Sequence, residues 1–165
     1  MENIPQNCIL EEGFVYEIVK KIPTNSLNRI FLVKFEDEEC IAKVIKLEHK
    51  DNFLNEATIL QLFINEDKII QYKKSGTGLL KFQDKDGVIS ENVNYIIFEY
   101  APKGDLADYL IQQSGLNILE NGVLNEEFSK YIFYKILEGI EKCHQKNICH
   151  RDIKLDNIFW ETFTN

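Results

Sequence analysis

The stretch His150–Asn157 has the sequence His-Arg-Asp-Ile-Lys-Leu-Asp-Asn, and the interpretation of the whole chain depends on it. A turn that only packs against a core would not carry so many charged groups, because burying each of them costs free energy. A site that handles phosphate and a metal ion needs this mixture of basic groups and oxygen ligands. The alternative is a solvated loop that is merely charged, and the length of the pattern disfavours it.

The spacing in this stretch matches a known motif. His-Arg-Asp followed by four residues and Asn resembles the catalytic loop of the protein kinases. The resemblance implies that Asp152 accepts the proton of the substrate hydroxyl and that Asn157 binds a magnesium ion. Lys154 resembles the lysine that serine/threonine kinases place near the transferred phosphate, where tyrosine kinases have other residues. The resemblance to this family implies an α+β, protein kinase-like fold. It also implies a protein that uses ATP and magnesium and acts on protein substrates.

Composition agrees with an ordinary folded domain. The 165 residues are enough for one domain, with 44% hydrophobic and 28% charged residues. A net charge of −8 argues against nucleic acid and anionic membrane surfaces as partners. No apolar run approaches the roughly 20 residues of a membrane span, and the N-terminus lacks the features of a signal peptide. We therefore expect a cytoplasmic protein, with its four scattered cysteines free and buried.

The first hundred residues predict a small β-rich lobe. Residues 1–13 show little pattern and are expected to be a lead-in. Runs of β-branched and aromatic residues predict strands at four places, residues 14–22, 29–35, 40–47 and 94–100. Residues 69–100 hold two strand-like runs, of which residues 94–100 are the clearer, and Asp84–Gly87 in the same span is a turn signal. By the resemblance, residues 14–100 form the N-lobe of a kinase, residues 101–105 the hinge and residues 106–165 part of the C-lobe.

The first predicted turn, Pro23–Asn28, occupies the place of the kinase glycine-rich loop, whose backbone closes over the ATP phosphates. In that alignment Ile30 takes the place of the valine that ends the motif. The turn contains no glycine. Because glycine lets the backbone approach phosphate closely, and because Pro23 lacks an N–H donor, we expect this turn to hold phosphates weakly.

Two charged residues resemble the ion pair that positions ATP in kinases. The strand Cys40–Ile45 resembles the Val-Ala-Ile-Lys segment, which makes Lys43 the lysine that binds the phosphates. Residues 52–63 predict a helix, with Glu56 beside an apolar stripe. The resemblance makes Glu56 the acid that pairs with Lys43. The alternative is that both side chains face solvent.

The segment Ile97–Leu106 resembles the hinge between the two kinase lobes. The resemblance implies that Phe98 closes the back of the pocket and that the backbone of Glu99 and Ala101 binds adenine. Asp105 has two interpretations. It would either face the ribose hydroxyls or cap the short helix that follows, since aspartate is a preferred residue at helix N-termini.

The sequence departs from the family pattern in the adenine site and in the metal site. Ile41 replaces a residue that is usually small, and Phe159 replaces a leucine, so both should crowd the adenine. Asp-Phe-Gly, whose aspartate is the second metal ligand of kinases, does not occur in the 165 residues.

We therefore expect residues 14–165 to be the incomplete, N-terminal portion of a serine/threonine kinase domain, with little activity alone. The alternative is a catalytically inactive pseudokinase that acts as a binding or scaffold module.

The longest predicted helix covers residues 125–145. Asn125 can cap it, and its apolar residues cover about half of its circumference, namely Phe128, Ile132, Phe133, Ile136, Leu137, Ile140 and Cys143. So wide an apolar surface needs packing neighbours on two sides. We expect the isolated chain to self-associate through this helix, to bind a partner there, or to be loosely packed in this part.

Overall fold

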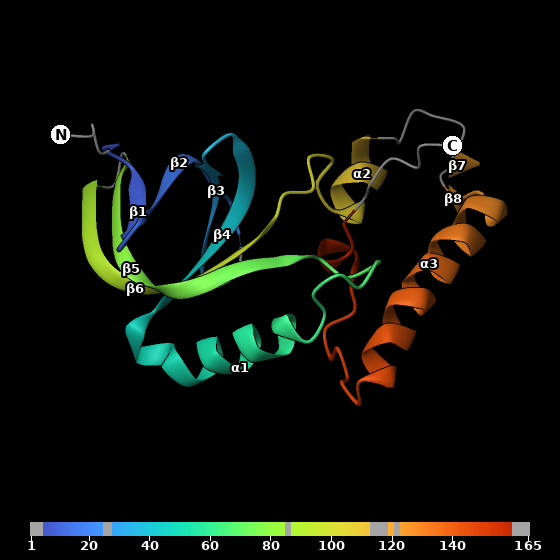
Figure 1. The fold of residues 1–165 in the computed structure, drawn as a ribbon. Coiled ribbons are helices and arrows are strands. Elements are labelled where there is room, and N and C mark those ends of the chain that lie inside the picture. Colours follow the sequence, from blue (N-terminus) through green and yellow to red (C-terminus); the bar gives the residue numbers. More distant parts are fainter. Residues whose placement is uncertain (1–4, 25–27, 85–86, 113–118, 121–122, 160–165) are drawn as a thin grey trace. The chain divides into compact units, whose positions relative to one another are not determined.

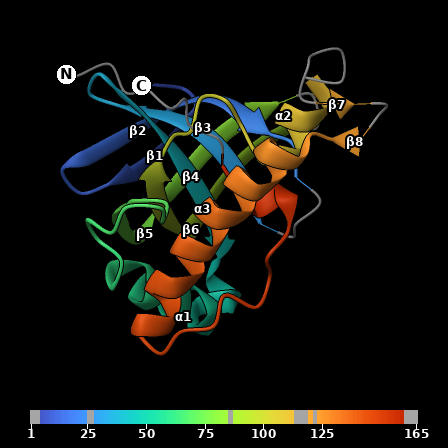
Figure 2. The ribbon, with the colours of Figure 1, turned by 90° about the vertical axis from the view of Figure 1, so that its right-hand side faces the viewer.

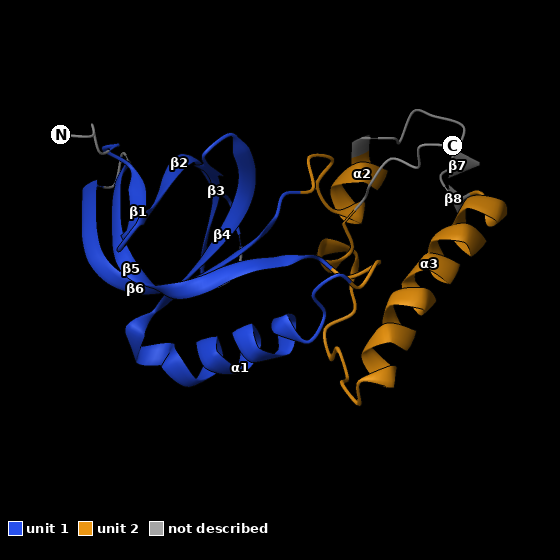
Figure 3. Cartoon of the chain, viewed as in Figure 1, with its two compact units in different colours: residues 1–65, 70–100 blue, residues 66–69, 101–165 orange. Residues whose placement is uncertain are grey.

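The computed structural model describes residues 5–24, 28–84, 87–112, 119–120 and 123–159. The chain divides into two units (Figure 3). Residues 1–65 and 70–100 form the first, and residues 66–69 and 101–165 form the second. The short segment 66–69 therefore belongs to the second unit, although the residues before and after it belong to the first.

Strands rich in β-branched and aromatic residues build the first unit (Figure 1). They are β1 Cys8–Glu11, β2 Phe14–Ile22, β3 Arg29–Phe35, β4 Glu38–Lys46, β5 Tyr72–Asp84 and β6 Gly87–Glu99. All neighbours are antiparallel, in the order β1-β2-β3-β4-β6-β5, and β1 also pairs with β5. The predicted Asp-Gly turn joins β5 to β6, and its residues 85–86 lie outside the described part of the chain.

Strand β1 lies in the segment that was expected to be a lead-in, and the sequence does not predict it. Its Cys8 and Ile9 are fully buried. The Glu11 carboxylate accepts a hydrogen bond of 2.5 Å from the Tyr95 hydroxyl and lies 2.6 Å from Lys74 Nζ. Four residues are too short for alternation to show in a sequence, so pairing with β2 and β5 defines this strand.

The two faces of the sheet bury different apolar clusters. Along β4, Ala42 and Val44 point into the larger cluster, which also contains Phe31, Tyr95 and Ile97. Helix α1, Lys50–Gln61, follows the short 3₁₀ helix η1, Leu47–His49, and lies across the other face (Figures 1 and 2). There α1 buries two of its residues, Phe53 and Ala57, against Ile45 and Ile96. Alternation along β4 thus directs residues 41, 43 and 45 to the α1 face.

The second unit is built around α3 (Glu126–Gln145). Its other elements are helix α2 (Leu106–Gln112), the short strands β7 (Leu119–Glu120) and β8 (Val123–Leu124), and the 3₁₀ helix η2 (Leu155–Asn157). The predicted cap of α3 is confirmed, because Asn125 Oδ1 accepts a 3.1 Å hydrogen bond from the Phe128 N–H. After α3 the chain runs back beside that helix (Figures 1 and 2). It then meets α2, where Leu106 N–H donates to Ile158 O at 2.7 Å.

Helix α3 is incompletely covered within the described residues. Ile132 and Cys143 are its buried residues. Phe133, Tyr134 and Leu137 are 62%, 60% and 46% exposed. The broad apolar surface predicted for this helix therefore has a large solvent-facing part in the described structure.

The cysteines follow the expectation in part. All four are free thiols, and Cys8, Cys40 and Cys143 are buried as expected. Cys149 is exposed, contrary to the expectation, because it lies in the irregular segment between α3 and the charged stretch. Among the described helices, none combines the length and apolar character needed to span a bilayer.

Candidate nucleotide-binding and catalytic site

The predicted site residues form two groups, one in each unit. In the first unit, Lys43 of β4 forms an ion pair with both carboxylate oxygens of Glu56 on α1. Lys43 Nζ lies 2.6 Å from Glu56 Oε1 and 2.7 Å from Oε2. Both side chains are partly buried. The packing of Phe53 and Ala57 fixes the rotation of α1, and this rotation turns Glu56 towards β4. The pairing predicted for these two residues is confirmed, and the solvent-facing alternative is wrong.

Two apolar residues lie on the same face of the sheet as Lys43. Ile41 is two residues before Lys43, so the period of two in a strand directs both to one face. Ile30 pairs in register with Lys43, and residues directly opposite in antiparallel strands point to the same side. The sheet therefore brings Ile30, Ile41 and Lys43 together as predicted.

Register also adds two residues that the sequence interpretation missed. Ile22 lies opposite Ile30, and Leu32 lies opposite Ile41. Leu32 is buried, and Ile22 is half-buried beside the turn that follows β2. A period of two counted from Ile30 would have found Leu32. Ile22 needed the pairing of β2 with β3, which a single strand does not reveal.

The turn between β2 and β3 is described only at its ends. Pro23 is exposed and Asn28 is half-buried. Asn25, which the alignment places at the second glycine of the family motif, lies outside the described residues. The expectation that this turn holds phosphates weakly stays a prediction.

The residues predicted to bind adenine through their backbone lie at the end of β6 and just after it. The N–H of Glu99 donates to Gln71 O at 2.9 Å, and the Glu99 carboxylate accepts from Gln71 N–H at 2.7 Å. Ala101 is buried, and its carbonyl accepts from the N–H of Gly104 at 3.1 Å. Gln71, which sequence reasoning did not single out, is thus the residue that holds Glu99 in place.

Asp105 acts as a helix cap. Its Oδ1 accepts a 2.8 Å hydrogen bond from Asp108 N–H, and its carbonyl accepts from the N–H of Tyr109. The capping interpretation is therefore confirmed, whereas a contact with ribose stays a prediction. Asp105 also forms an isolated antiparallel bridge with Phe159, whose side chain is 50% exposed.

The charged stretch of the second unit holds its predicted site residues close together. Asn157 Nδ2 donates to Asp152 Oδ2 at 2.8 Å and to Asp152 O at 2.9 Å. Lys154 Nζ lies 3.1 Å from the same Oδ2. Arg151 has a positive φ of 65°, an uncommon conformation for a residue with a side chain. The turn thus brings Asp152, Lys154 and Asn157 together, as the spacing predicts.

Electrostatics keep Asp152 ionised. Its pKa is lowered below the ordinary aspartate value, first by the hydrogen bond from Lys154 and then by the bond from Asn157. The Asp152 N–H also contacts His150 Nδ1 at 3.3 Å. A carboxylate that is ionised and oriented in this way can accept a hydrogen bond from a hydroxyl group at neutral pH.

The oxygen atoms of Asn157 and Asp152 suit a magnesium ion in kind, and its other ligands would come from phosphate and water. The described residues contain no cluster of three or more His, Cys, Asp or Glu side chains that could hold a metal alone. The amide oxygen of Asn157 and the carboxylate of Asp152 are the oxygen ligands that a hard cation prefers. Magnesium commonly takes one or two protein oxygens together with phosphate oxygens and water. The site therefore fits a magnesium ion that arrives with a nucleotide.

Comparison with known proteins agrees with this geometry. Residues 13–164 match the protein kinase domain family. The chain is 34% identical over 71 residues to the SNF1-related protein kinase catalytic subunit alpha KIN12 of Arabidopsis thaliana, which covers 43% of this chain and 13% of that protein. It is 28% identical over 119 residues to the serine/threonine protein kinase OSK3 of Oryza sativa subsp. indica, covering 72% of this chain and 19% of that protein.

A third relative is the NUAK family SNF1-like kinase 2 of Rattus norvegicus, which is 40% identical over 70 residues, 42% of this chain and 10% of that protein. The chain thus spans less than a fifth of the length of these curated relatives.

Proposed function

The chain belongs to the protein kinase family, and on this premise we propose that it binds ATP with magnesium and serves phosphoryl transfer to serine or threonine hydroxyls of proteins. The serine/threonine kinase names of the relatives support the choice of substrate. Lys154 supports it as well, because serine/threonine kinases carry a lysine at this place in their catalytic loop.

The observation that carries the proposal is the contact of both Lys154 and Asn157 with one oxygen of Asp152. Held in this way, the Asp152 carboxylate accepts the proton of the attacking hydroxyl. Lys154 supplies positive charge beside it, which offsets negative charge that develops during transfer. Such orientation and charge supply most of the catalysis in phosphoryl transfer, since the protein has little covalent chemistry to perform.

The Lys43–Glu56 pair supports the nucleotide half of the proposal. Glu56 holds the Lys43 ammonium in a fixed position, from which it binds the phosphates of ATP. When bound, ATP supplies the transferable phosphoryl group and its magnesium ion neutralises phosphate charge. Asn157 would hold that ion through its amide oxygen, and the backbone of Glu99 and Ala101 would hold the adenine.

Affinity for nucleotide is expected to be low. In the family the positions of Ile41 and Phe159 flank the adenine, so these larger side chains would crowd it, and the turn after Ile22 lacks glycine. We expect ATP to bind about a hundredfold more weakly than in an ordinary kinase site, a difference of about 3 kcal/mol. Isothermal titration calorimetry with magnesium and ATP measures this. Replacing Ile41 with Ala and Phe159 with Leu should recover part of the affinity.

A second candidate function is that of a pseudokinase, a binding or scaffold module without turnover. The glycine-free turn at residues 23–28 and the large side chains of Ile41 and Phe159 favour it, because both should weaken nucleotide binding. The 165 residues supply Asn157 but not the second metal ligand of the family, so we expect negligible transfer by the purified 165-residue chain. We also propose that the protein acts in the cytoplasm on a protein substrate or partner.

Two experiments separate the candidates. In the first, the purified chain receives labelled ATP, magnesium and a serine-containing peptide, beside an Asp152→Asn control. Incorporation well above the control would contradict the expected inactivity. The second is to determine the coding sequence downstream of Asn165. Three in-frame codons for Asp-Phe-Gly would favour an active kinase. A stop codon before any such codons would favour the binding module.

A further inference from the structure

Strand β1 lies outside the part of the chain that matches the kinase family. That match begins at residue 13, whereas β1 ends at Glu11. β1 pairs antiparallel with β2 on one side and with β5 on the other, so that Cys8 lies opposite both Glu17 and Lys81 (Figure 1). Without β1, the sheet would end in β2 on one side and in β5 on the other. β1 therefore covers both of these edges.

Two glycines of β5 make room for β1. A Cβ atom at Gly78 would lie 2.6 Å from the Leu10 carbonyl oxygen. A Cβ atom at Gly76 would overlap Glu11 Oε1 and would lie 3.0 Å from the Tyr95 hydroxyl oxygen. Glycine weakens the interior of a strand and often marks a place where another backbone approaches closely. The two glycines therefore indicate that β5 accommodates β1 at the expense of its own strand propensity.

The side chain of Glu11 ends between two polar groups of neighbouring strands. Its Oε2 accepts a 2.5 Å hydrogen bond from the Tyr95 hydroxyl and lies 2.6 Å from Lys74 Nζ. The same Nζ lies 3.0 Å from the centre of the Phe14 ring on β2. We call Glu11, Lys74 and Tyr95 the carboxylate clamp. The clamp joins β1 to β5 and β6, and Lys74 extends the contact to β2.

The clamp keeps Glu11 ionised. Burial alone would raise the pKa of Glu11, but the hydrogen bonds from Lys74 and Tyr95 outweigh burial, and this pKa lies below the ordinary glutamate value. Hydrogen bonds to an ionised acceptor are roughly twice as strong as those between neutral groups. Removing the charge of Glu11 should therefore loosen β1 without removing its backbone pairing.

The edges beneath β1 can pair with other strands when they are uncovered. An edge strand presents unpaired N–H and C=O groups, and folded proteins commonly cover such edges. β2 has 9 residues and β5 has 13, which is long enough for pairing. A second copy of the chain suits both edges, because it carries the same strands and its own β1. Only the two residues Glu12 and Gly13 join β1 to β2, and a terminal element of this kind can be exchanged between copies.

We propose that β1 is a strap, closed by the carboxylate clamp, that keeps the edges of β2 and β5 from pairing with a second copy of the chain. Residues of the clamp take no part in the proposed nucleotide and phosphate contacts. The inference therefore does not rest on the proposed function.

Hydrogen exchange measures how often the strap opens. Two amides report on it, because Ile18 N–H donates to Asn7 O at 3.0 Å and Gln83 N–H donates to Asn7 Oδ1 at 2.9 Å. Asn7 directly precedes β1. Glu11→Gln removes the charge and keeps the shape of the side chain. In this variant we expect both amides to exchange about tenfold faster, because β1 opens more often. Unchanged exchange would overturn the proposal.

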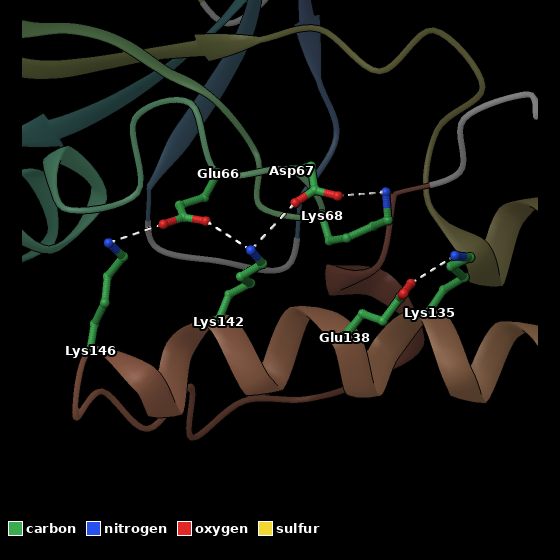
Figure 4. Close-up of polar contacts among 7 residues, drawn as sticks. All are labelled: Glu66, Asp67, Lys68, Lys135, Glu138, Lys142 and Lys146. Carbon is green, nitrogen blue, oxygen red and sulfur yellow. Dashed lines mark hydrogen bonds and ion pairs between the residues drawn. The ribbon is translucent and has the colours of Figure 1, made fainter.

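The matched control is Glu138→Gln on α3 (Figure 4). Lys135 Nζ lies 2.7 Å from Glu138 Oε2, and these two side chains are 31% and 30% exposed. The side chains of Lys74 and Glu11 are 28% and 24% exposed, so the two ion pairs are covered to a similar degree. The control pair lies within one helix and joins no separate strands. It should leave both reporting amides unchanged, and an equal change in the control would contradict the clamp.

Two further variants test the clamp by independent routes. Lys74→Met removes the other charge, and its effect on exchange should not add to that of Glu11→Gln, because each removes the same pair. Gly76→Ala leaves every charge in place, but its methyl group should displace Glu11 and also speed exchange. Additive effects of the two charge variants, or slow exchange in Gly76→Ala, would overturn the clamp. If Glu11→Gln lacks a cooperative urea transition, Lys74→Met takes its place.

Sedimentation velocity tests whether the strap protects the edges of the sheet. Association needs an open strap, so a tenfold larger open fraction should lower the dissociation constant of the dimer at least tenfold in Glu11→Gln. Association through α3 would occur equally in the unmodified protein, and the difference therefore reports on the sheet. The amides of β3 and β4 should stay protected in the variant, which distinguishes edge pairing from unfolding. Faster exchange with unchanged sedimentation would overturn the protective role of β1.

Discussion

The sheet of the first unit and helix α3 of the second differ in how they bury apolar side chains. Phe31, Tyr95 and Ile97 are at most 1% exposed, because strands on both sides of each supply neighbours. On α3, Phe133 and Leu137 are largely exposed within the described structure. The strands thus depend on tertiary packing, whereas α3 shows local stabilisation by its cap and by ion pairs such as Lys130–Glu126.

A matched pair of phenylalanine substitutions tests this difference most strongly. Phe31 is fully buried, and its ring lies 5.0 Å from that of Phe82. Phe31→Ala should lower the free energy of unfolding by about 3–5 kcal/mol, because it leaves a cavity. Phe133→Ala should change it by less than about 0.5 kcal/mol, since this ring faces solvent. Urea denaturation followed by circular dichroism measures both, and similar losses would show that Phe133 is covered in solution.

Protection of the backbone amides from hydrogen exchange with solvent should differ between the same two regions. Amides of β3, β4 and β6 should exchange about a hundredfold more slowly than those of α3, because local opening is easier where few apolar contacts are lost. Sedimentation velocity on the same sample shows whether the chain self-associates through residues 125–145. A monomer with strong protection along the whole helix would contradict the expectation of association, partner binding or loose packing.

High pH should act mainly on the sheet. Burial raises the pKa of Tyr16 to about 12 from an ordinary value of 10.0. Because the pKa of Tyr16 is higher in the folded state, the unfolded chain loses this proton first as the pH rises. The contribution of Tyr16 to the free energy of unfolding is therefore fully present below pH 10 and is lost as the pH rises towards 12. The loss from this residue should be about 2 kcal/mol at pH 12. Tyr16→Phe should therefore flatten the pH dependence of unfolding between pH 10 and 12; an unchanged slope would exclude Tyr16 as its source.

The smallest expected effect concerns the cap of α3. Asn125→Ala removes the hydrogen bond to Phe128 N–H and should lower stability by about 1 kcal/mol, whereas Asn125→Ser should be nearly neutral. Thermal unfolding monitored at 222 nm by circular dichroism compares them. If alanine and serine behave alike, the cap contributes little and packing of α3 must account for its stability.

Elements with a strong local signal were predictable from sequence. The limits of β2 and β3 are those expected from their β-branched and aromatic runs, and the cap at Asn125 was predicted from one residue type at one position. The pairing of Lys43 with Glu56 and the grouping of Asp152, Lys154 and Asn157 followed from motif spacing. In each case the interacting groups lie in a short segment or in motifs that come in a known order.

Contacts between distant segments were decided by tertiary structure alone. β1 exists because β2 and β5 pair with it, and four residues cannot signal this. Asp105 could be a cap or a ribose ligand by sequence, and the fold shows its capping hydrogen bond with Asp108. The pairing of Glu66 with Lys142 and Lys146 had no sequence signal, since surface charges are common and pair with whatever the path of the chain brings within reach. Local propensity acts over a few residues, whereas these contacts depend on where the folded backbone places segments that are far apart in sequence.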